Sequence, residues 1–336
     1  MMPGGRNQET SGRSSPGSGF GTAPSSRSMK PSTSPWARLP PLCSDQISGS
    51  GSSGSARSSS RSSGSSSAAA SSHADRNHSP TRSGSSHERS HLMKSVILLA
   101  GMGSRLAELT VSTPKSLLAI GDSNTLEHMI RKLTKHDVCS IVIVCGHMQG
   151  AIEQYLLQAF PLVEITTLRN PDYRTTNTGY SLLLARDQLE GETFIKLDGD
   201  VIFDEEILAR LVVAAAGSSY ACVDRTTVDE EVIKVQCDAE GNISRIGNDV
   251  PVTSAAGESI GIERIDERSC EMLFATLEAM MEDPANHQRY YEVAYDAIVQ
   301  AGEPFKALDI TGLRWAEIDT FEDYELAQRL FGQVDT

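Results

Sequence analysis

The sequence of 336 residues lacks long apolar runs, paired cysteine motifs and an excess of basic residues. No apolar run reaches the ~20 residues that a membrane-spanning helix needs, and no hydrophobic stretch marks a secretory signal. The six cysteines are scattered without a C-x-x-C pair. This excludes a zinc site of the usual spacing and suits a reducing compartment. We therefore expect a cytoplasmic protein without a membrane span.

Composition divides the chain in two. Residues 1–91 contain 30 serines and almost no periodic apolar pattern. Such a segment cannot bury enough apolar surface to offset its ordering entropy, so we predict that it is disordered. Its net charge of +6, in a chain of −14, leaves −20 on residues 92–336, whose length suits one α/β domain. A domain this acidic is a poor partner for nucleic acid, because such binding depends on basic surface.

Apolar patterns in residues 92–336 alternate between short strands and helical periods. The first half predicts strands at 95–99, 141–145, 163–168 and 193–197, with helices at 124–136, 148–159 and 178–188. This alternation predicts a doubly wound, mostly parallel, Rossmann-like α/β sheet that binds ligands at the carboxyl ends of its strands. The second half predicts a hairpin over 232–246, helices at 267–282 and 288–301, a strand pair within 305–318 and a closing helix at 320–331.

A glycine turn directly after the first predicted strand is the most informative segment. The last strand residue and the turn are Leu99, Ala100, Gly101, Gly103 and Ser104. Arg105 follows, and Lys115 comes ten residues later. Small residues let backbone N–H groups approach a phosphate, which the arginine and lysine would neutralise. A dinucleotide fingerprint is excluded because Leu106 stands where its third glycine is needed, and a Walker loop because no Gly-Lys-Ser/Thr follows.

This segment resembles the signature of the nucleotidyltransferase superfamily, which includes the MobA-like NTP transferases. That signature reads L-A-A-G-x-G-S/T-R-L followed by P-K-x-L, and Leu99 replaces its first alanine. The resemblance spans about residues 94–331. It implies that the turn residues bind a nucleoside triphosphate and that Arg105 and Lys115 are catalytic. The larger Leu99 side chain is expected to shift how the base or ribose sits.

Two acidic segments indicate a metal site. Asp198 and Asp200 flank a glycine at the end of a predicted buried strand, and carboxylate oxygens are the ligands that Mg²⁺ prefers. The resemblance implies that Asp200 is the first ligand and leaves the role of Asp198 open. A late segment, 315–324, resembles the family pattern W-x-E-I-D-T-x-E-D and implies that Asp319 completes the Mg²⁺ site. Asp319 or Thr320 also suits the cap of the closing helix, and both roles can hold together.

The loop over 170–182 resembles the branch that handles phosphocholine, inositol phosphate and phosphonate. The resemblance implies that Thr176, Asn177 and Ser181 contact the nucleotide. The alternative is that Asn177 or Thr178 only caps the helix that follows.

A cluster of three tyrosines within six residues stands out in a chain with 5% aromatic residues. Aromatic faces beside carboxylates suit an ammonium head through cation–π contact. The resemblance implies that Tyr291, Tyr295 and Asp296 line an acceptor site, with Glu258 close to it. The alternative is that Tyr291 and Tyr295, at helical spacing, belong to the core.

These features predict a Mg²⁺-dependent enzyme that transfers a nucleotidyl group, with CTP favoured, to a small phosphate or phosphonate such as phosphocholine or aminoethylphosphonate. Pyrophosphate would be released. The alternatives are a sugar-1-phosphate nucleotidyltransferase and a catalytically silent protein that binds nucleotide as a regulator.

Overall fold

The computed structural model describes residues 93–226 and 228–333. All of these residues belong to one compact unit. The segment predicted to be disordered, 1–91, lies outside the described residues. Within the part that the structure describes, no helix has the length and apolar character needed to cross a membrane.

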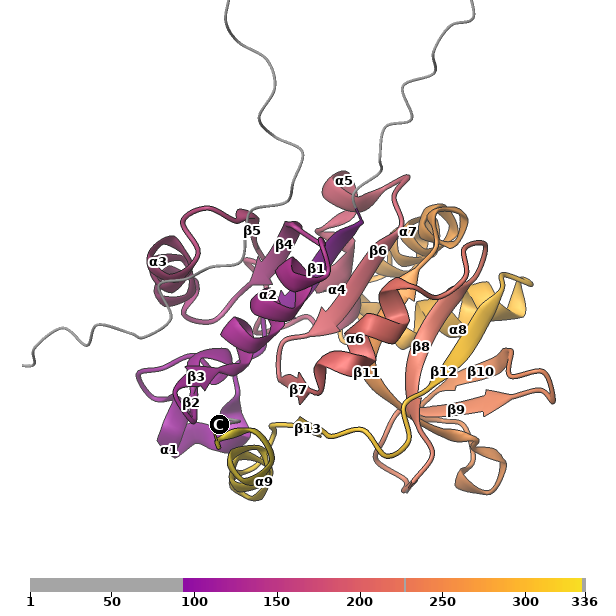
Figure 1. The fold of residues 1–336 in the computed structure, drawn as a ribbon. Helices are drawn as coiled ribbons and strands as arrows, with labels where there is room; N and C mark the ends of the chain where they lie inside the picture. Colours follow the sequence, from indigo (N-terminus) through magenta and orange to yellow (C-terminus); the bar gives the residue numbers. More distant parts are fainter. Residues whose placement is uncertain (1–92, 227, 334–336) are drawn as a thin grey trace, which may run out of the picture. The chain divides into compact units, whose positions relative to one another are not determined.

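Four parallel strands form the part of the sheet that leads to the glycine turn (Figure 1). β1 lies between β4 and β6, and β5 continues the sheet beyond β4. Their bounds are Lys94–Leu99 for β1, Ser140–Cys145 for β4, Glu164–Arg169 for β5 and Phe194–Asp198 for β6. The doubly wound parallel arrangement predicted for the first half is therefore confirmed.

Alternate residues of the central strands enter two different cores. Val96 and Val142 belong to one apolar cluster, whereas Ile97 and Ile143 belong to the other. Both faces of the strands are therefore covered, which is why these segments read as continuous apolar runs.

The helices of the first half follow the predicted order, with one break. α2 (Thr125–Lys135) and α3 (Gln149–Ala159) lie where the periodicity predicted them. Asn124 caps α2, its side chain accepting a hydrogen bond from the Glu127 backbone N–H at 2.9 Å. The single helix predicted at 178–188 is instead two short helices, α4 (Thr178–Leu183) and α5 (Arg186–Leu189).

The second half makes the sheet mixed. β11 (Gly257–Ile265) pairs antiparallel with β6, β8 and β9. The predicted hairpin is confirmed by the antiparallel pairing of β9 (Lys234–Cys237) with β10 (Ile243–Gly247). The other elements here are α6 (Glu205–Val212), β8 (Ser219–Asp224), α7 (Glu267–Met281), α8 (Glu292–Gln300) and β12 (Phe305–Asp309).

The two strands predicted around 305–318 are present, but they do not pair with each other. β12 pairs with β8, whereas β13 (Trp315–Glu317) pairs antiparallel with β7 (Val201–Phe203). β7 directly follows the Asp200 turn, so this pairing brings the late acidic segment back to it. The closing helix, α9 (Phe321–Phe331), begins immediately afterwards.

Shorter elements complete the described chain near the glycine turn. These are α1 (Ala107–Thr110), β2 (Ala119–Ile120) and β3 (Ser123–Asn124), the last two forming a small antiparallel pair.

Candidate active site

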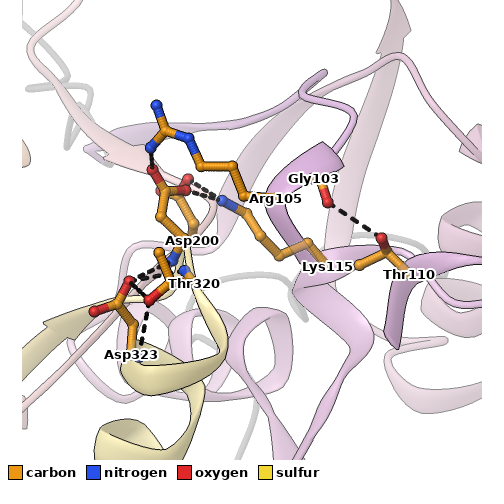
Figure 2. Close-up of polar contacts among 8 residues, drawn as sticks. Gly103, Arg105, Thr110, Lys115, Asp200, Thr320 and Asp323 are labelled. Carbon is orange, nitrogen blue, oxygen red and sulfur yellow. Dashed lines mark hydrogen bonds and ion pairs between the residues drawn. The ribbon is translucent and has the colours of Figure 1, made fainter. Parts of the chain in front are cut away.

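The glycine turn is open to solvent at the carboxyl end of β1. Gly101, Ser104 and Arg105 are exposed. Gly103 has a φ of 60°, and a Cβ added to it would lie 3.3 Å from the Cβ of Lys115. The Gly103 carbonyl accepts a hydrogen bond from the Thr110 hydroxyl at 3.2 Å (Figure 2). The turn is thus fixed by local contacts and presents its polar atoms outward.

Asp200 lies beside this turn because β6 runs parallel to β1. Leu98 pairs with Asp198, and the Gly199 N–H donates to the Leu98 carbonyl at 3.0 Å. A Cβ on Gly199 would lie 2.6 Å from that carbonyl oxygen and would collide with the Leu99 side chain. Only glycine therefore allows the chain to bend this closely against the end of β1.

Asp319 reaches the same place through the β7–β13 pair. Glu317 pairs with Val201, and the Ile318 N–H donates to the Asp200 carbonyl at 3.0 Å. The side chain of Thr320 caps α9 and forms a capping box with Asp323 (Figure 2). Thr320 therefore serves as the cap, and the Asp319 side chain is left to face the turn.

Two basic side chains from the turn region meet these two aspartates. The Lys115 Nζ lies 2.7 Å from Asp200 Oδ2 and 2.7 Å from Asp319 Oδ1. Arg105 pairs with the other oxygen of Asp319, Oδ2, at 2.9 Å. The structure thus brings together Arg105, Lys115, Asp200 and Asp319, four residues that the sequence separates by up to 214 positions.

Glu317 joins this cluster, and sequence reasoning missed it. The carboxylates of Asp200, Glu317 and Asp319 each offer an oxygen, and the three oxygens lie within 4.8 Å of one another. An all-oxygen donor set of this kind fits Mg²⁺. The sequence did contain a sign of it: Glu317 and Asp319 are two residues apart in an extended segment, and such residues point to the same side of the chain.

The charges gathered in this cluster shift the pKa values of its own members. Burial alone would lower the pKa of Lys115, but the charges of Asp200 and Asp319 outweigh burial and hold this pKa well above its usual value. Desolvation, followed by repulsion from Asp200 and Asp319, raises the pKa of Glu317 to about 8. A concentrated set of carboxylates with shifted pKa values is typical of a functional site.

The other residues predicted to bind nucleotide differ in exposure. Leu99 and Ala100 are each 8% exposed, and Leu99 packs in the core against Gly199. Ser181 is buried, and its hydroxyl accepts a hydrogen bond from the Asn170 side chain at 3.0 Å, as does that of Thr176. Asn177 caps α4, as the alternative proposed. These contacts give Ser181 and Asn177 a structural role in the loop.

The residues predicted to bind the acceptor are mostly engaged within the protein. Tyr291 and Tyr295 are 1% and 0% exposed, which favours the alternative that both belong to the core. Asp296 forms an ion pair with Arg245 at 2.9 Å and accepts from the Ile246 N–H at 3.0 Å. Glu258 is partly buried, and desolvation followed by repulsion from Asp229 raises its pKa to about 7.

A buried network lies behind Asp198. Lys196 is fully buried and pairs with Glu263 at 2.9 Å and with Asp198 at 3.1 Å. The Tyr291 hydroxyl donates to Asp198 at 2.6 Å and also contacts the Lys196 ammonium. Gly261 passes so near that a side chain there would collide with Asp198. The network therefore encloses one side of the turn that carries Asp200.

A cavity of about 360 Å³ opens at the start of α8, between that helix and the ends of β9 and β10. Its walls include Arg289, Tyr290, Glu292 and Asp296. Tyr290 is 46% exposed, whereas Glu292 is 6% exposed. One oxygen of Glu292 is buried without a hydrogen-bond partner among the described residues. Burial raises the pKa of Glu292 to about 8.

Part of the chain is similar to proteins of known families. Residues 95–249 match the MobA-like NTP transferase domain, so the predicted relation to the nucleotidyltransferase superfamily is confirmed. The chain is 29% identical over 245 residues to the CMP-5'-(3-aminopropyl)phosphonate synthase of Streptomyces rubellomurinus, covering 71% of this chain and 39% of that protein. It is 32% identical over 154 residues to the choline-phosphate cytidylyltransferase of Haemophilus influenzae, covering 46% of this chain and 62% of that protein.

The solved structure of the inositol-1-phosphate CTP transferase from T. maritima shares the fold. Its TM-score is 0.61 at 20% identity, covering 73% of this chain and 99% of that one. A solved UDP-glucose pyrophosphorylase shares the fold as well. The chain spans between 39% and 62% of the length of the two curated relatives described above.

Proposed function

We propose that this protein transfers a cytidylyl group from CTP to a small phosphate or phosphonate and releases pyrophosphate. The observation that supports this most strongly is the meeting of Arg105 and Lys115 with Asp200 and Asp319 beside an exposed glycine turn. In this reaction an acceptor oxygen attacks the α-phosphorus of CTP. The bond from that phosphorus to the bridging oxygen breaks, and pyrophosphate leaves.

The chain's own residues have distinct parts in this proposal. The glycine turn presents backbone N–H groups to the triphosphate, and Arg105 and Lys115 stabilise the charge on the departing pyrophosphate. Asp200, Asp319 and Glu317 would hold Mg²⁺, which when bound supplies positive charge to the reacting phosphate. No general base is needed, because an acceptor phosphate with a second pKa near 6 is already largely ionised at neutral pH.

We further propose that the acceptor carries an amino or ammonium group and that the cavity at the start of α8 receives it. Glu292 has a buried oxygen without a hydrogen-bond partner among the described residues; a bound ammonium group would lower its raised pKa and favour the carboxylate, and the exposed Tyr290 offers an aromatic face. Two relatives bear names, aminopropylphosphonate synthase and choline-phosphate cytidylyltransferase, in which the acceptor combines a phosphorus group with nitrogen. Tyr290 thus takes the part that the sequence had suggested for Tyr291 and Tyr295.

A matrix of substrates tests this function. CTP, UTP, dTTP and GTP are each combined with phosphocholine, aminoethylphosphonate, aminopropylphosphonate, inositol-1-phosphate and glucose-1-phosphate, and pyrophosphate release is measured. We expect CTP with a nitrogen-bearing acceptor to give the highest kcat/KM. Preference for glucose-1-phosphate with another nucleotide would instead establish a sugar-1-phosphate nucleotidyltransferase. Nucleotide binding without pyrophosphate release from any pair would establish a silent regulator.

A further inference from the structure

We propose that Lys115 has a second role, which rests on the proposed function: its ammonium competes with the divalent cation for the oxygens of Asp200 and Asp319, so that metal binding depends on nucleotide. The Nζ lies 2.7 Å from an oxygen of each aspartate, which is the position of a bridging cation. A single side chain therefore bridges two members of the three-carboxylate cluster.

Both carboxylate oxygens of Asp319 contact a basic side chain. Oδ1 pairs with Lys115, and Oδ2 pairs with Arg105 at 2.9 Å. A cation shared by Asp319 and Asp200 would take the place that the Lys115 ammonium now holds between Oδ1 of Asp319 and Oδ2 of Asp200.

The surroundings of the two basic residues differ. The Lys115 side chain is 17% exposed, whereas that of Arg105 is 72% exposed. Water screens an exposed charge, so Arg105 is the weaker competitor. Lys115 is the residue whose charge a metal ion would meet at close range.

The Lys115 ammonium has an alternative position near the glycine turn. Its aliphatic stem lies along the glycine turn, since a Cβ on Gly103 would be 3.3 Å from the Lys115 Cβ and 3.7 Å from its Cδ. Rotation about side-chain bonds alone would carry the ammonium from the carboxylates toward a triphosphate held at that turn. The nucleotide thus offers Lys115 new oxygen partners and leaves the carboxylates to the metal ion.

Binding of Mn²⁺ tests this inference without turnover. Free Mn²⁺ is measured by electron paramagnetic resonance for wild type, Lys115→Met and Arg105→Met, with and without the non-reacting analogue α,β-methylene-CTP. Without nucleotide, we expect Lys115→Met to bind Mn²⁺ at least tenfold more tightly than wild type, and Arg105→Met to change affinity less than threefold. The analogue should raise the affinity of wild type at least tenfold and reduce the advantage of Lys115→Met.

The possible results separate the two proposals. Equal affinity of wild type and Lys115→Met without nucleotide overturns the competition, as does an equal gain for Arg105→Met, which would indicate only a general charge effect. Mn²⁺ binding by none of the three proteins also overturns it. If the competition is observed but no nucleotide and acceptor pair releases pyrophosphate, the competition stands and the proposed transfer fails. Circular dichroism confirms that each variant is folded.

Discussion

Two lysines of this protein lie between carboxylates, and their surroundings give them different parts. Lys115 pairs with Asp200 and Asp319 at the open glycine turn, whereas Lys196 pairs with Asp198 and Glu263 in the interior. Lys115 is partly exposed, and Lys196 is fully buried beneath Tyr291. The first lysine is within reach of solvent, whereas the second is shielded from it.

The comparison teaches that the same chemistry can serve a reaction or a fold. Lys196, Glu263 and Tyr291 hold Asp198 from the interior, and Gly199 packs against the end of β1. These contacts fix the turn that carries Asp200. The buried lysine thus supports the turn that carries Asp200, one of the two partners of the exposed lysine.

Removing the exposed lysine should have the largest effect on turnover. In Lys115→Met, the charge that stabilises the departing pyrophosphate is lost, so kcat should fall by about 10²–10³ or more. The free energy of unfolding should change by less than about 1 kcal/mol, because the pairs of Lys115 are partly exposed. A pyrophosphate-release assay and urea unfolding measure the two effects. Comparable turnover in wild type and variant would remove Lys115 from the reaction.

Removing the buried lysine should reverse that pattern. In Lys196→Met, the carboxylates of Asp198 and Glu263 lose their cation inside the protein, which should cost about 3–5 kcal/mol of unfolding free energy. Urea unfolding measures the loss. The double variant Lys196→Met/Glu263→Gln is the matched control, and it should recover part of the stability because one unpaired charge is gone. A single variant as stable as wild type would contradict the structural role of Lys196.

A third test concerns Glu292 at the cavity. Burial raises its pKa from 4.5 to about 8, so the folded state holds this proton more tightly than the unfolded state does. Stability is therefore lost as pH rises from 4.5 to 8. Glu292→Gln should match wild type below pH 4.5 and be more stable above pH 8 by roughly 2–4 kcal/mol.

The same Glu292→Gln variant tests the cavity as an acceptor site. Its KM for a nitrogen-bearing acceptor should rise about tenfold, which corresponds to the loss of one charge contact of about 1.4 kcal/mol. Its KM for CTP should stay unchanged. Unfolding followed at several pH values and steady-state kinetics give the two readouts, and an unchanged acceptor KM would move the acceptor out of this cavity.

The smallest predicted effect concerns the end of the late acidic segment. Thr320→Ala removes the cap of α9 and should cost about 1 kcal/mol of unfolding free energy. Because Asp319 precedes this cap, kcat should fall severalfold at most. Thr320→Ser keeps the hydroxyl and should restore both values. Loss of stability by Thr320→Ser equal to that of Thr320→Ala would show that the hydroxyl does not matter.

Local patterns predicted most of the fold. The apolar run at 141–145 and the helical spacing of 124–136 lie within one or two residues of β4 and α2. The β7–β13 pair could not be predicted, because β7 has only three residues and its partner lies more than 100 residues away. That pair, rather than any local signal, brings Asp319 to Asp200.

The candidate site was predicted in part. The glycine turn, Arg105 and Lys115 follow from the sequence, since their spacing is itself the signal. The pairing of Asp200 with Asp319 required the family resemblance. Tyr291 and Tyr295 could not be resolved from sequence, because helical spacing fits a core as well as an acceptor site. Only burial separates them from Tyr290.

The central claim is that Asp200 and Asp319 act together in nucleotidyl transfer. The most direct test is pyrophosphate release by Asp200→Asn/Asp319→Asn, measured with CTP and the preferred acceptor. Asp309→Asn, which alters an exposed carboxylate paired with Arg225, serves as the control. We predict that the double variant, still folded, loses about 10³-fold or more of kcat, while the control keeps the wild-type rate. A folded double variant that retains more than about a tenth of the wild-type rate, which is a loss of less than about 1.4 kcal/mol, would contradict the account.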